Sequence, residues 1–282
     1  MSEILYGSPV ADTLRIELGS RIAALREKGV EPCLAIVRVG EDPGSLSYER
    51  SALRACAKAD IRSRSLVLPA DSSAEDVIAR LETISADPAI HGCLLLRPLP
   101  KQIEEHRVCA ALCPEKDVDG ATDASLRRVF VGRGPGFCPC TPEAVLALLD
   151  YYGVPLAGKR VTIVGRSLVV GRPLALLMTG RDATVTLCHR KSPELPARCR
   201  EADILVAAAG SAGLITADYV REGQTVVDVG TSLNAEGKLC GDVDFSAAEP
   251  RAAALSPVPG GVGAITTAIL MKHVITAAEL LT

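Results

Sequence analysis

A glycine-rich turn between a predicted strand and a predicted helix is the clearest chemical feature of the sequence. The β-branched run at residues 161–164 leads into Gly165, and an apolar, helix-forming run begins soon after Gly171. A strand, a glycine turn and a helix start, in this order, present backbone N–H groups to a pyrophosphate. The spacing departs from G-x-G-x-x-G because Ser167 takes the place of the second glycine. Such a turn is also found in α/β domains that bind no dinucleotide.

Three cations near this turn narrow the expected ligand. Arg190 and Lys191 follow the next predicted strand, and Arg166 lies on the turn itself. In NAD-binding folds an acidic side chain at this strand end binds the ribose 2′-hydroxyl, whereas arginine holds a 2′-phosphate bidentately. The pattern favours NADP, although Arg190 and Lys191 are also consistent with a solvated loop end. Small residues also end two further predicted strands, near 207–210 and 228–231. Small residues allow the backbone to lie against a flat nicotinamide, but they also close ordinary turns between strands and helices.

Composition is typical of a globular α/β protein. The 282 residues suffice for two domains with their own cores. Aromatic residues make up 3% and tryptophan is absent, so the cores must pack Leu, Val, Ile and Ala, as buried parallel strands do. A net charge of −3 without long basic runs indicates no nucleic-acid or membrane partner. We expect no spanning stretch of about 20 apolar residues and no secretion leader, hence a cytoplasmic location.

The ten cysteines are scattered without a C-x-x-C pair, and the four histidines show no paired ligand spacing. We therefore expect no metal site and reduced thiols, as is usual in the cytoplasm. Cys138 and Cys140 form an isolated C-P-C, and a redox role for this pair stays open.

Helical and strand patterns alternate and predict two α/β units with parallel sheets. Residues 131–142, rich in Gly and Pro, are the expected linker. The last helix, 265–281, is expected to pack back on the first unit, so that residues 1–140 with 265–282 form one domain and 141–264 form an inserted, Rossmann-like domain. The expected elements are helices at 9–28, 45–60 (with Ser45 as candidate N-cap), 73–85, 101–112, 143–152, 171–179, 194–200 and 216–221, and strands at 33–39, 65–68, 92–96, 160–164, 183–188, 203–207 and 225–229.

Eight short segments, in order and with fitting gaps, match one enzyme family. They are V-G-E-D-P-G-S-L-S-Y from Val39, P-E-K-D-V-D-G from Pro114, C-T-P from Cys140, V-G-R-S-L-V-V-G-R-P from Val164, A-D-I-L-V-A-A-A-G from Ala202, V-V-D-V-G from Val226, G-D-V from Gly241 and P-V-P-G-G-V-G-A-I-T from Pro257. By these segments the chain resembles the bifunctional methylenetetrahydrofolate dehydrogenase/cyclohydrolases, the FolD family, over essentially its whole length.

The resemblance implies a fold and an activity. Enzymes of this family oxidise 5,10-methylenetetrahydrofolate to 5,10-methenyltetrahydrofolate by hydride transfer to NADP, and most then hydrolyse the product to 10-formyltetrahydrofolate. They are usually homodimers of two α/β domains, with the active-site cleft between the domains. We accordingly expect tetrahydrofolate one-carbon adducts as substrates, NADP as cofactor and a homodimer, with a separate cyclohydrolase as a candidate partner in the same pathway.

The resemblance also assigns site residues position by position. Tyr48 resembles the tyrosine that stacks on the folate, and Asp119 the aspartate that binds the pterin by accepting two hydrogen bonds from its aminopyrimidine edge. Without the resemblance, a solvated turn aspartate and a tyrosine in the core or on the surface remain open. Pro259 and Gly260 resemble part of the folate loop. The expected cofactor contacts are Thr141, Gly165, Arg166, Ser167, Arg190, Thr231 and Thr266.

The family pattern breaks at two positions. The family has Y-x-x-x-K after the tyrosine, and here the lysine position is Ala52; it has Q-L-P-L-P after the third strand, and here Leu96 replaces the glutamine. In the family the lysine is catalytic and the glutamine hydrogen-bonds to it. Hydride transfer depends mainly on positioning and should survive. Hydrolysis needs a moved proton, so cyclohydrolase activity should be weak or absent.

Nearby arginines are not expected to substitute for the lysine. Arg97 should alternate to the opposite face of its strand, and Arg50 and Arg54 should lie on the far side of the helix from Ala52. Arginine also stays protonated and cannot act as a base.

Two other hypotheses remain. The protein could be a relative repurposed for another substrate, or a non-catalytic binder of folate or NADP. Retention of Tyr48, Asp119 and the glycine turn argues against the second of these. Dehydrogenase assays with NAD and NADP separate the hypotheses.

Overall fold

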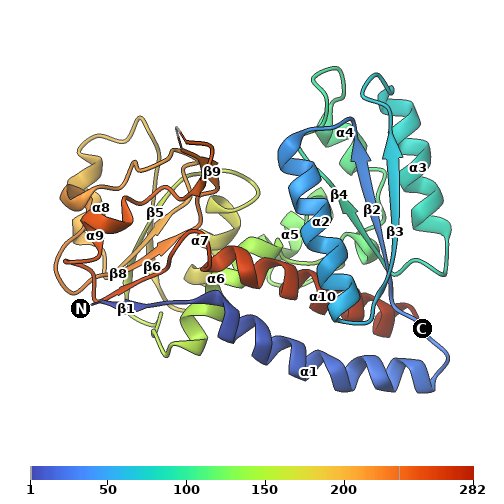
Figure 1. Ribbon diagram of the computed structural model, residues 1–282, viewed down its shortest axis with the longest axis horizontal. Coiled ribbons are helices and arrows are strands. Elements are labelled where there is room, and N and C mark those ends of the chain that lie inside the picture. The colour runs from blue at the N-terminus through green and yellow to red at the C-terminus, as the bar shows by residue number, and fades with distance from the viewer. Residues whose placement is uncertain (1, 235) are drawn as a thin grey trace. The chain divides into compact units, whose positions relative to one another are not determined.

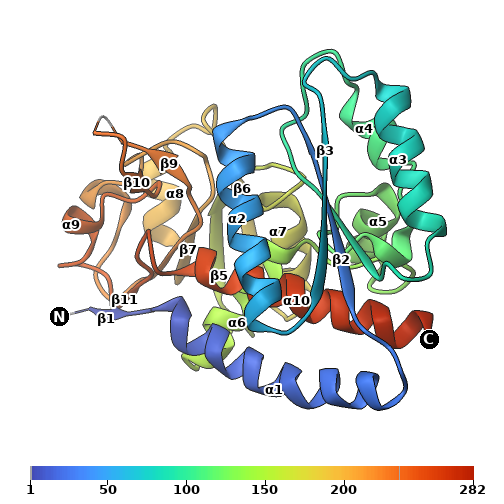
Figure 2. The same ribbon diagram turned by 45° about the vertical axis from the view of Figure 1, so that its right-hand side comes forward.

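The computed structural model describes residues 2–234 and 236–282. The described chain forms two compact α/β units, each built around parallel strands, as the sequence predicts (Figures 1 and 2). Each unit has a core of aliphatic side chains, which follows from a composition poor in aromatic residues.

The two units are assembled from segments distant in the sequence. The described residues up to Asp12 join Thr141–Thr266 in what we call the six-stranded unit, after its main sheet. Thr13–Cys140 joins Thr267–Thr282 in what we call the three-stranded unit. The C-terminal segment therefore returns to the unit that holds most of the first half of the chain.

The sheet of the three-stranded unit has the parallel order β3-β2-β4. Its central strand β2 (Cys33–Val39) is buried at every position, as in sheets covered on both faces. The edge strand β3 (Arg62–Leu68) is mostly exposed, so only its apolar end is visible in the sequence pattern. The short strand β4 (Gly92–Leu95) ends just before Leu96.

Several helices of the three-stranded unit begin at residues whose side chains cap the first turn. Those helices are α2 (Pro43–Lys58), α3 (Ala74–Ala86), α4 (Glu105–Cys109), the 3-10 turn Pro114–Lys116, α5 (Asp123–Val131) and most of α1 (Gly7–Glu27) and α10 (Val262–Leu281). Asp42, not the expected Ser45, caps α2, because its side chain accepts the Ser45 N–H at 2.9 Å. Ser73 and Asp76 form a capping box at α3. Helix α5, which the pattern does not predict, is capped by Thr122.

Helix α10 contradicts the expectation that the chain has no long apolar stretch. It is long and apolar enough to cross a membrane by length and composition, with a mean hydropathy of 1.4 in its most apolar window, whereas no such stretch is expected from the sequence. That window is 61% buried inside the protein. Helix α10 runs beside α1 (Figures 1 and 2), where Arg21 donates hydrogen bonds to Thr276 and Glu279. These features are typical of a core helix.

The sheet of the six-stranded unit has the parallel order β1-β11-β8-β7-β5-β6. Its strands are β1 (Glu3–Ile4), β5 (Arg160–Val164), β6 (Thr184–Cys188), β7 (Ile204–Ala207), β8 (Thr225–Asp228) and β11 (Ala254–Leu255). Around it lie α6 (Cys140–Tyr151), α7 (Gly171–Thr179), α8 (Leu195–Glu201), the 3-10 turn Ala217–Tyr219, α9 (Phe245–Ala248) and the antiparallel pair β9 (Ser232–Leu233) and β10 (Leu239–Cys240). The strand–helix alternation is Rossmann-like, as predicted.

The division of the chain differs from the expected domains at the N-terminus. Residues up to Asp12 are expected in the first domain, but they group with the six-stranded unit. The reason is the parallel pairing of β1 with β11, in which Glu3 is opposite Ala254. A two-residue strand has too few positions to show a periodic pattern, so this partner cannot be recognised from the sequence.

Candidate active site

The helix that carries Tyr48 is anchored on both sides. Asp42 caps its first turn, and the buried Glu49 next to Tyr48 accepts the Arg38 Nε–H at 2.7 Å. Arg38 belongs to the central strand β2, so this ion pair joins α2 to the middle of the sheet. Glu49 also accepts the hydroxyl of Ser65 on β3. The position of Tyr48 is therefore set by a cap and a buried polar network.

Tyr48 and Asp119 lie in one electrostatic environment. The Tyr48 hydroxyl has a pKa well above its usual value, first because it is buried and then because Asp119 and Cys140 lie near it. The hydroxyl is therefore protonated at neutral pH. The structure thus brings together the two residues that the resemblance assigns to folate binding.

Asp119 is shielded from solvent and faces a cation. Its side chain is 17% exposed, and its Oδ2 lies 3.6 Å from Nη2 of Arg97. Burial raises the pKa of Asp119 to about 6, while Arg97 and a hydrogen bond with Cys140 act in the opposite direction. The alternative of a solvated turn aspartate is wrong for this residue.

Strand alternation predicts that Arg97 faces away from this site, but the structure places its side chain next to Asp119. The Leu96 N–H still bonds to the Val37 carbonyl at 2.9 Å, but β4 has ended and Arg97 lies beyond the pleat. Its guanidinium therefore lies between Asp119 and Glu105, whose Oε1 is 3.1 Å from Nη1. Burial would lower the pKa of Arg97, but the two carboxylates outweigh burial and raise it. Arg97 is a permanent cation.

The turn that presents Asp119 is fixed by its neighbours. The buried Asp117 accepts the N–H groups of Ala121 at 2.9 Å and Thr122 at 2.8 Å. Gly120 has a φ of +69°, and a Cβ at this position would lie 2.6 Å from the Pro139 nitrogen. The segment K-D-V-D-G is thus a rigid turn, in which the first aspartate is structural and the second faces the site.

A thiol and an imidazole meet just before Asp119 in this unit. Cys140 Sγ and His273 Nδ1 both lie near the Val118 carbonyl oxygen, at 3.2 and 2.8 Å, and 3.6 Å from each other. Because a carbonyl only accepts, His273 Nδ1 donates its proton to it. His273 is not predicted from the sequence, since a single histidine in an apolar helix gives no distinguishing signal.

The two positions at which the resemblance places the family's lysine and glutamine hold apolar residues that are closed to solvent. Ala52 is 0% exposed and Leu96 is 3% exposed. Arg50 and Arg54 are exposed, in agreement with their expected place on the other side of α2. The buried Lys116 gives no replacement, because its Nζ donates to carbonyl oxygens of Ile84, Ser85 and Asp87.

The glycine turn of the six-stranded unit is packed without room for side chains. Gly165 has a φ of +132°, and a Cβ there would lie 1.9 Å from the Ala208 carbonyl oxygen. A Cβ on Gly171 would lie 1.9 Å from the Gly165 carbonyl oxygen. Ser167 closes the turn, since its Oγ accepts the Val170 N–H at 3.1 Å. The turn therefore holds the start of α7 directly against the end of β5.

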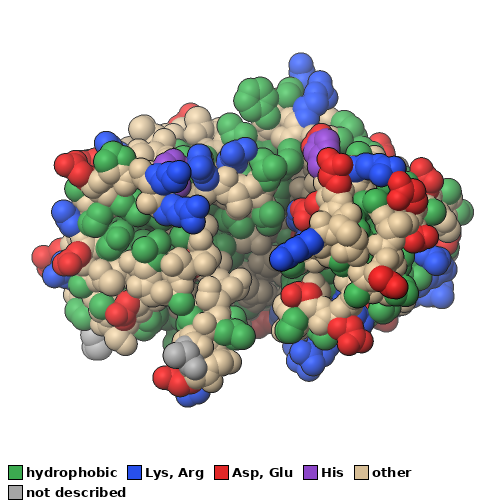
Figure 3. Space-filling model, turned by 90° about the horizontal axis from the view of Figure 1, so that it is seen from above, with side chains coloured by type: hydrophobic (Ala, Val, Ile, Leu, Met, Phe, Trp, Pro, Cys, Tyr) green, Lys and Arg blue, Asp and Glu red, His purple; other side chains and the backbone are tan. Residues whose placement is uncertain are grey.

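The predicted cations follow the ends of β5 and β6, two strands that pair in parallel. Arg166, Arg190 and Lys191 are all exposed. The loop after β6 is ordered by the His189 N–H, which donates to Ser192 Oγ at 3.0 Å. Figure 3 shows Lys and Arg side chains gathered beside a histidine on one face of the protein. Exposed cations after the parallel strands β5 and β6 suit a phosphorylated ligand.

Two buried carboxylates, which the sequence pattern does not predict, fix the neighbouring loops. Asp228 accepts backbone N–H groups of the segment after β8 and of the segment before α9, and Asp242 accepts those of the segment after β7. The donors to Asp228 are Gly230 at 2.9 Å, Asp242 at 3.0 Å and Val243 at 2.9 Å, and those to Asp242 are Ala209 at 2.5 Å, Gly210 at 3.0 Å and Ser211 at 2.7 Å. Burial raises the pKa of Asp228 to about 6, although its backbone donors lower it.

The other predicted contacts all belong to the six-stranded unit. Pro259 and Gly260 are exposed, and Gly260 has a φ of +106°. Thr141 is half-buried in the first turn of α6, and Thr231 is exposed after β8. Thr266 is buried, and its hydroxyl donates to the Val262 carbonyl of its own helix at 3.3 Å.

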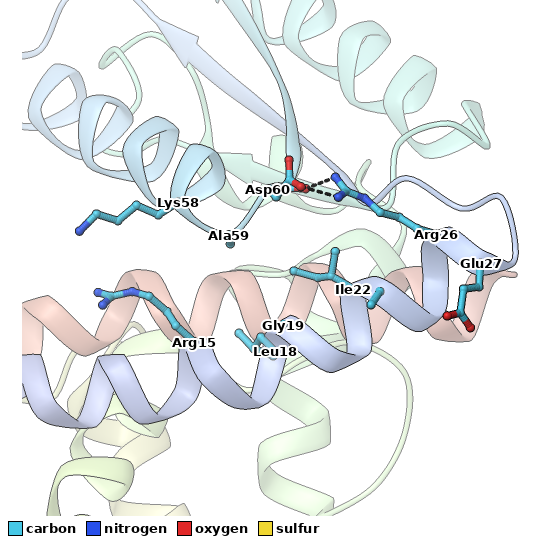
Figure 4. A pocket seen from close by; sticks show the side chains of 10 residues that line it. Arg15, Leu18, Gly19, Ile22, Arg26, Glu27, Lys58, Ala59 and Asp60 are labelled. Carbon is cyan, nitrogen blue, oxygen red and sulfur yellow. Dashed lines mark hydrogen bonds and ion pairs between the residues drawn. The ribbon is translucent and has the colours of Figure 1, made fainter.

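A separate pocket lies between α1 and the end of α2 (Figure 4). The Arg26–Asp60 ion pair lies at one side of it, and Arg15 and Lys58 lie at the other. None of the predicted site residues line this pocket. It is not part of the candidate site.

Comparison with protein families decides the relationship. The model of the tetrahydrofolate dehydrogenase/cyclohydrolase catalytic domain matches residues 5–119, and that of the family's NAD(P)-binding domain matches residues 139–282. The chain belongs to the tetrahydrofolate dehydrogenase/cyclohydrolase family.

Relatives and solved structures of this family span the whole chain. The bifunctional protein FolD of Carboxydothermus hydrogenoformans is 46% identical over 283 residues, which cover 100% of this chain and 99% of the relative. The structure of FolD from Campylobacter jejuni has a TM-score of 0.96 at 36% identity and covers 99% of both chains. FolD from Trypanosoma brucei, solved with NADP cofactor and an inhibitor, has a TM-score of 0.94 at 34% identity and covers 99% of this chain and 98% of its own.

The NAD(P)-binding domain of this family member has residues that fit a dinucleotide. The Gly165 and Gly171 positions, which admit no side chain, bring the start of α7 against the carboxyl end of β5. This is the place where α/β folds bind a pyrophosphate. The exposed Arg166 and Arg190 carry the positive charge that a further phosphate would need.

Proposed function

We propose that this FolD relative oxidises 5,10-methylenetetrahydrofolate with NADP, and that it hydrolyses the methenyl product slowly or not at all. The first part is supported by family membership and by the retained Tyr48 and Asp119. The single observation that carries the second part is the burial of Ala52 and Leu96 at the positions of the family's lysine and glutamine.

The residues of the three-stranded unit suit a positioning role. The Tyr48 ring is available to stack on a pteridine while its hydroxyl stays protonated. An ionised Asp119 accepts two hydrogen bonds from the aminopyrimidine edge and so fixes the orientation of the ring. Hydride transfer needs the reacting atoms about 3–3.5 Å apart, and orientation supplies most of its acceleration. Pro259 and Gly260, which belong to the six-stranded unit, are proposed to form part of the folate loop.

The six-stranded unit is proposed to hold NADP. Bound NADP would supply the nicotinamide ring that accepts the hydride. Gly165 and Ser167 form the turn proposed for the pyrophosphate, and Arg166 and Arg190 are proposed to bind the 2′-phosphate. NADP in the Trypanosoma brucei relative supports the choice of cofactor. Thr141, Thr231 and Thr266 are proposed as further contacts.

Among the described groups near Tyr48 and Asp119, we propose none that activates water for hydrolysis. Tyr48 keeps its proton because its pKa is well above the usual value, and Arg97 keeps its proton because its pKa is raised. Lys116 is occupied by backbone carbonyls. Asp119 is engaged with Arg97 and Cys140, and in the proposed complex with the pterin. Without such a group the hydrolytic step should lose about 10²–10⁴ in rate.

An assay with each of the two cofactors tests the dehydrogenase part of the proposal. Purified protein is given 5,10-methylenetetrahydrofolate with either NADP or NAD, and formation of the reduced cofactor is followed. We expect turnover with NADP and a much lower kcat/KM with NAD. Absence of turnover with either cofactor, with the substrate shown to be intact, would contradict the proposal.

Assembly and location are also proposals. The exposed edge strand β3, with Val67 56% exposed, is compatible with the homodimer expected from the resemblance. Light scattering on the purified protein would give its mass in solution. We further propose that the enzyme acts in the cytoplasm, which fractionation would test.

A further inference from the structure

Arg97 and Asp119 form an ion pair that the family pattern does not contain. The family's Q-L-P-L-P has leucine where this chain has Arg97. The guanidinium Nη2 lies 3.6 Å from Asp119 Oδ2, and the two side chains are 18% and 17% exposed. Glu105 bonds to the same guanidinium at 3.1 Å through Nη1. Glu105 thus holds Arg97 from one side while Arg97 faces Asp119 on the other.

Asp119 needs a cation beside it because it is buried. Desolvation disfavours the carboxylate, so the pKa of Asp119 is raised to about 6 even with Arg97 in contact. A protonated carboxyl group carries hydrogen on one oxygen and cannot accept from an aminopyrimidine edge with both oxygens. In the family a lysine stands one helical turn from the tyrosine, whereas here that position is the buried Ala52.

The other described groups that act on Asp119 carry no permanent positive charge. Asp117 is a like charge that raises the pKa of Asp119, while the Cys140 thiol and His273 lower it. Arg97 is therefore the one permanent cation among the described groups that act on the Asp119 carboxyl. The other titratable groups facing Asp119 are Asp117 in the same turn, Cys140 at the start of α6, His273 on α10 and Tyr48 on α2.

We propose that Arg97 is a positioning residue that keeps Asp119 ionised at neutral pH, so that the carboxylate binds the aminopyrimidine edge of the folate. This inference rests on the proposed function, in which Asp119 binds the pterin. Arg97 returns to the site a positive charge that the family supplies with the lysine missing at Ala52. It does not return proton transfer, since a guanidinium stays protonated. The chain thereby retains folate binding without regaining a base for hydrolysis.

The test compares the pH dependence of folate binding in the wild type and in Arg97→Leu, which installs the family's residue. Tetrahydrofolate binding is measured anaerobically by calorimetry, and kcat/KM for 5,10-methylenetetrahydrofolate is measured with saturating NADP, both from about pH 5.5 to 9. We expect the wild type to weaken below about pH 6, the pKa of Asp119. In Arg97→Leu this pH dependence should move up by about one pH unit, so that binding weakens about twofold at pH 7 and about eightfold at pH 5.5, and recovers as pH rises.

Two further variants separate charge from folding. Arg97→Lys keeps a cation near Asp119, so the pH below which its tetrahydrofolate binding weakens should stay within about half a unit of the wild-type value. Arg54→Leu removes an exposed arginine from α2 and should leave both measurements unchanged. Thermal melts of all three variants monitor folding. A shift in Arg97→Leu with a near-normal pH dependence in Arg97→Lys supports the inference.

Two outcomes would distinguish this inference from the proposed function. If Arg97→Leu is folded and binds tetrahydrofolate with the wild-type pH profile, the role of Arg97 is overturned while the dehydrogenase stands. If the wild type binds tetrahydrofolate with the expected Arg97-dependent pH profile but reduces no NADP, the inference is supported and the proposed function fails.

Discussion

Asp228 Oδ1 accepts the backbone N–H of Asp242 at 3.0 Å, and these two buried acids fix the loops that follow β7 and β8. Asp228 also accepts the Gly230 N–H, and Asp242 accepts the Gly210 N–H. The proposed cofactor contact Thr231 lies directly after Gly230. The geometry proposed for the nicotinamide side of the cofactor site therefore depends on side chains that need not touch the cofactor.

Replacing Asp228 by asparagine should loosen these loops. The amide NH₂ would face backbone N–H donors, and leaving such donors unpaired costs about 1–3 kcal/mol in the free energy of unfolding. We expect weaker NADP binding, measured by calorimetry, and lower stability, measured by urea unfolding. Asp244→Asn, at the exposed cap of α9, is a control that should leave NADP binding unchanged.

The pH dependence of stability gives a second check on Asp228. Its folded-state pKa is raised to about 6, so its stabilising contribution is present below its unfolded-state pKa and is lost as pH rises through about 6. The difference in unfolding free energy between the wild type and Asp228→Asn should therefore shrink between about pH 4 and pH 7. A difference that stays constant over this range would show that Asp228 is ionised in both states.

The glycine turn should not tolerate one methyl group. Gly165→Ala places a Cβ 1.9 Å from the Ala208 carbonyl oxygen at a φ of +132°, so the turn must rearrange. We expect a loss of about 1–3 kcal/mol or more in the free energy of unfolding, together with loss of NADP binding. Gly180→Ala, at the other end of α7, meets only ordinary contacts at 3.5 Å and should behave like the wild type.

Cofactor choice should depend on Arg190. A charge-assisted hydrogen bond contributes about 1.5–3 kcal/mol, so Arg190→Ala should raise KM for NADP by about 10- to 100-fold while KM for NAD changes little. Added salt should narrow the gap between wild type and variant, because the exposed guanidinium is screened. Equal effects on both cofactors would place Arg190 away from the 2′-phosphate. Arg133→Ala removes an exposed arginine from the three-stranded unit and serves as the control.

Restoring the family's pair should restore some hydrolysis. In the double variant Ala52→Lys/Leu96→Gln we expect methenyltetrahydrofolate hydrolysis to rise at least about tenfold, below the full 10²–10⁴ of a tuned acid–base group. The same substitution at an exposed site of α2, Ala57→Lys, controls for added charge and should have no effect. Melting curves must accompany this experiment, because both altered positions are buried.

Much of the fold is predictable because buried parallel strands and glycine turns leave strong local patterns. The run of β5 into Gly165 and α7 is visible as β-branched residues, a glycine and an apolar helix. The two-residue strand β1 leaves no such pattern, since it is defined by its pairing with β11, which is distant in the sequence. The α2 cap is misplaced because Asp42 and Ser45 are both good capping residues, and only geometry chooses between them.

The site is less predictable than the fold. Family motifs indicate Tyr48 and Asp119, and in the structure the charge of Asp119 acts on the Tyr48 hydroxyl. The pairing of Arg97 with Asp119 contradicts simple alternation, because the strand ends one residue before Leu96 and the pleat no longer directs the next side chain. The role of Asp228 also depends on long-range contacts, in its case to backbone groups brought together by folding.

The most direct test is the fate of the methenyl intermediate. Purified enzyme is mixed with 5,10-methenyltetrahydrofolate, and the loss of its absorbance is compared with an enzyme-free sample in the same buffer. We predict decay at the spontaneous rate, while the same preparation reduces NADP with 5,10-methylenetetrahydrofolate. Rapid, enzyme-dependent formation of 10-formyltetrahydrofolate would contradict the claim that a chain with Ala52 and Leu96 in place of the family's lysine and glutamine does not catalyse hydrolysis.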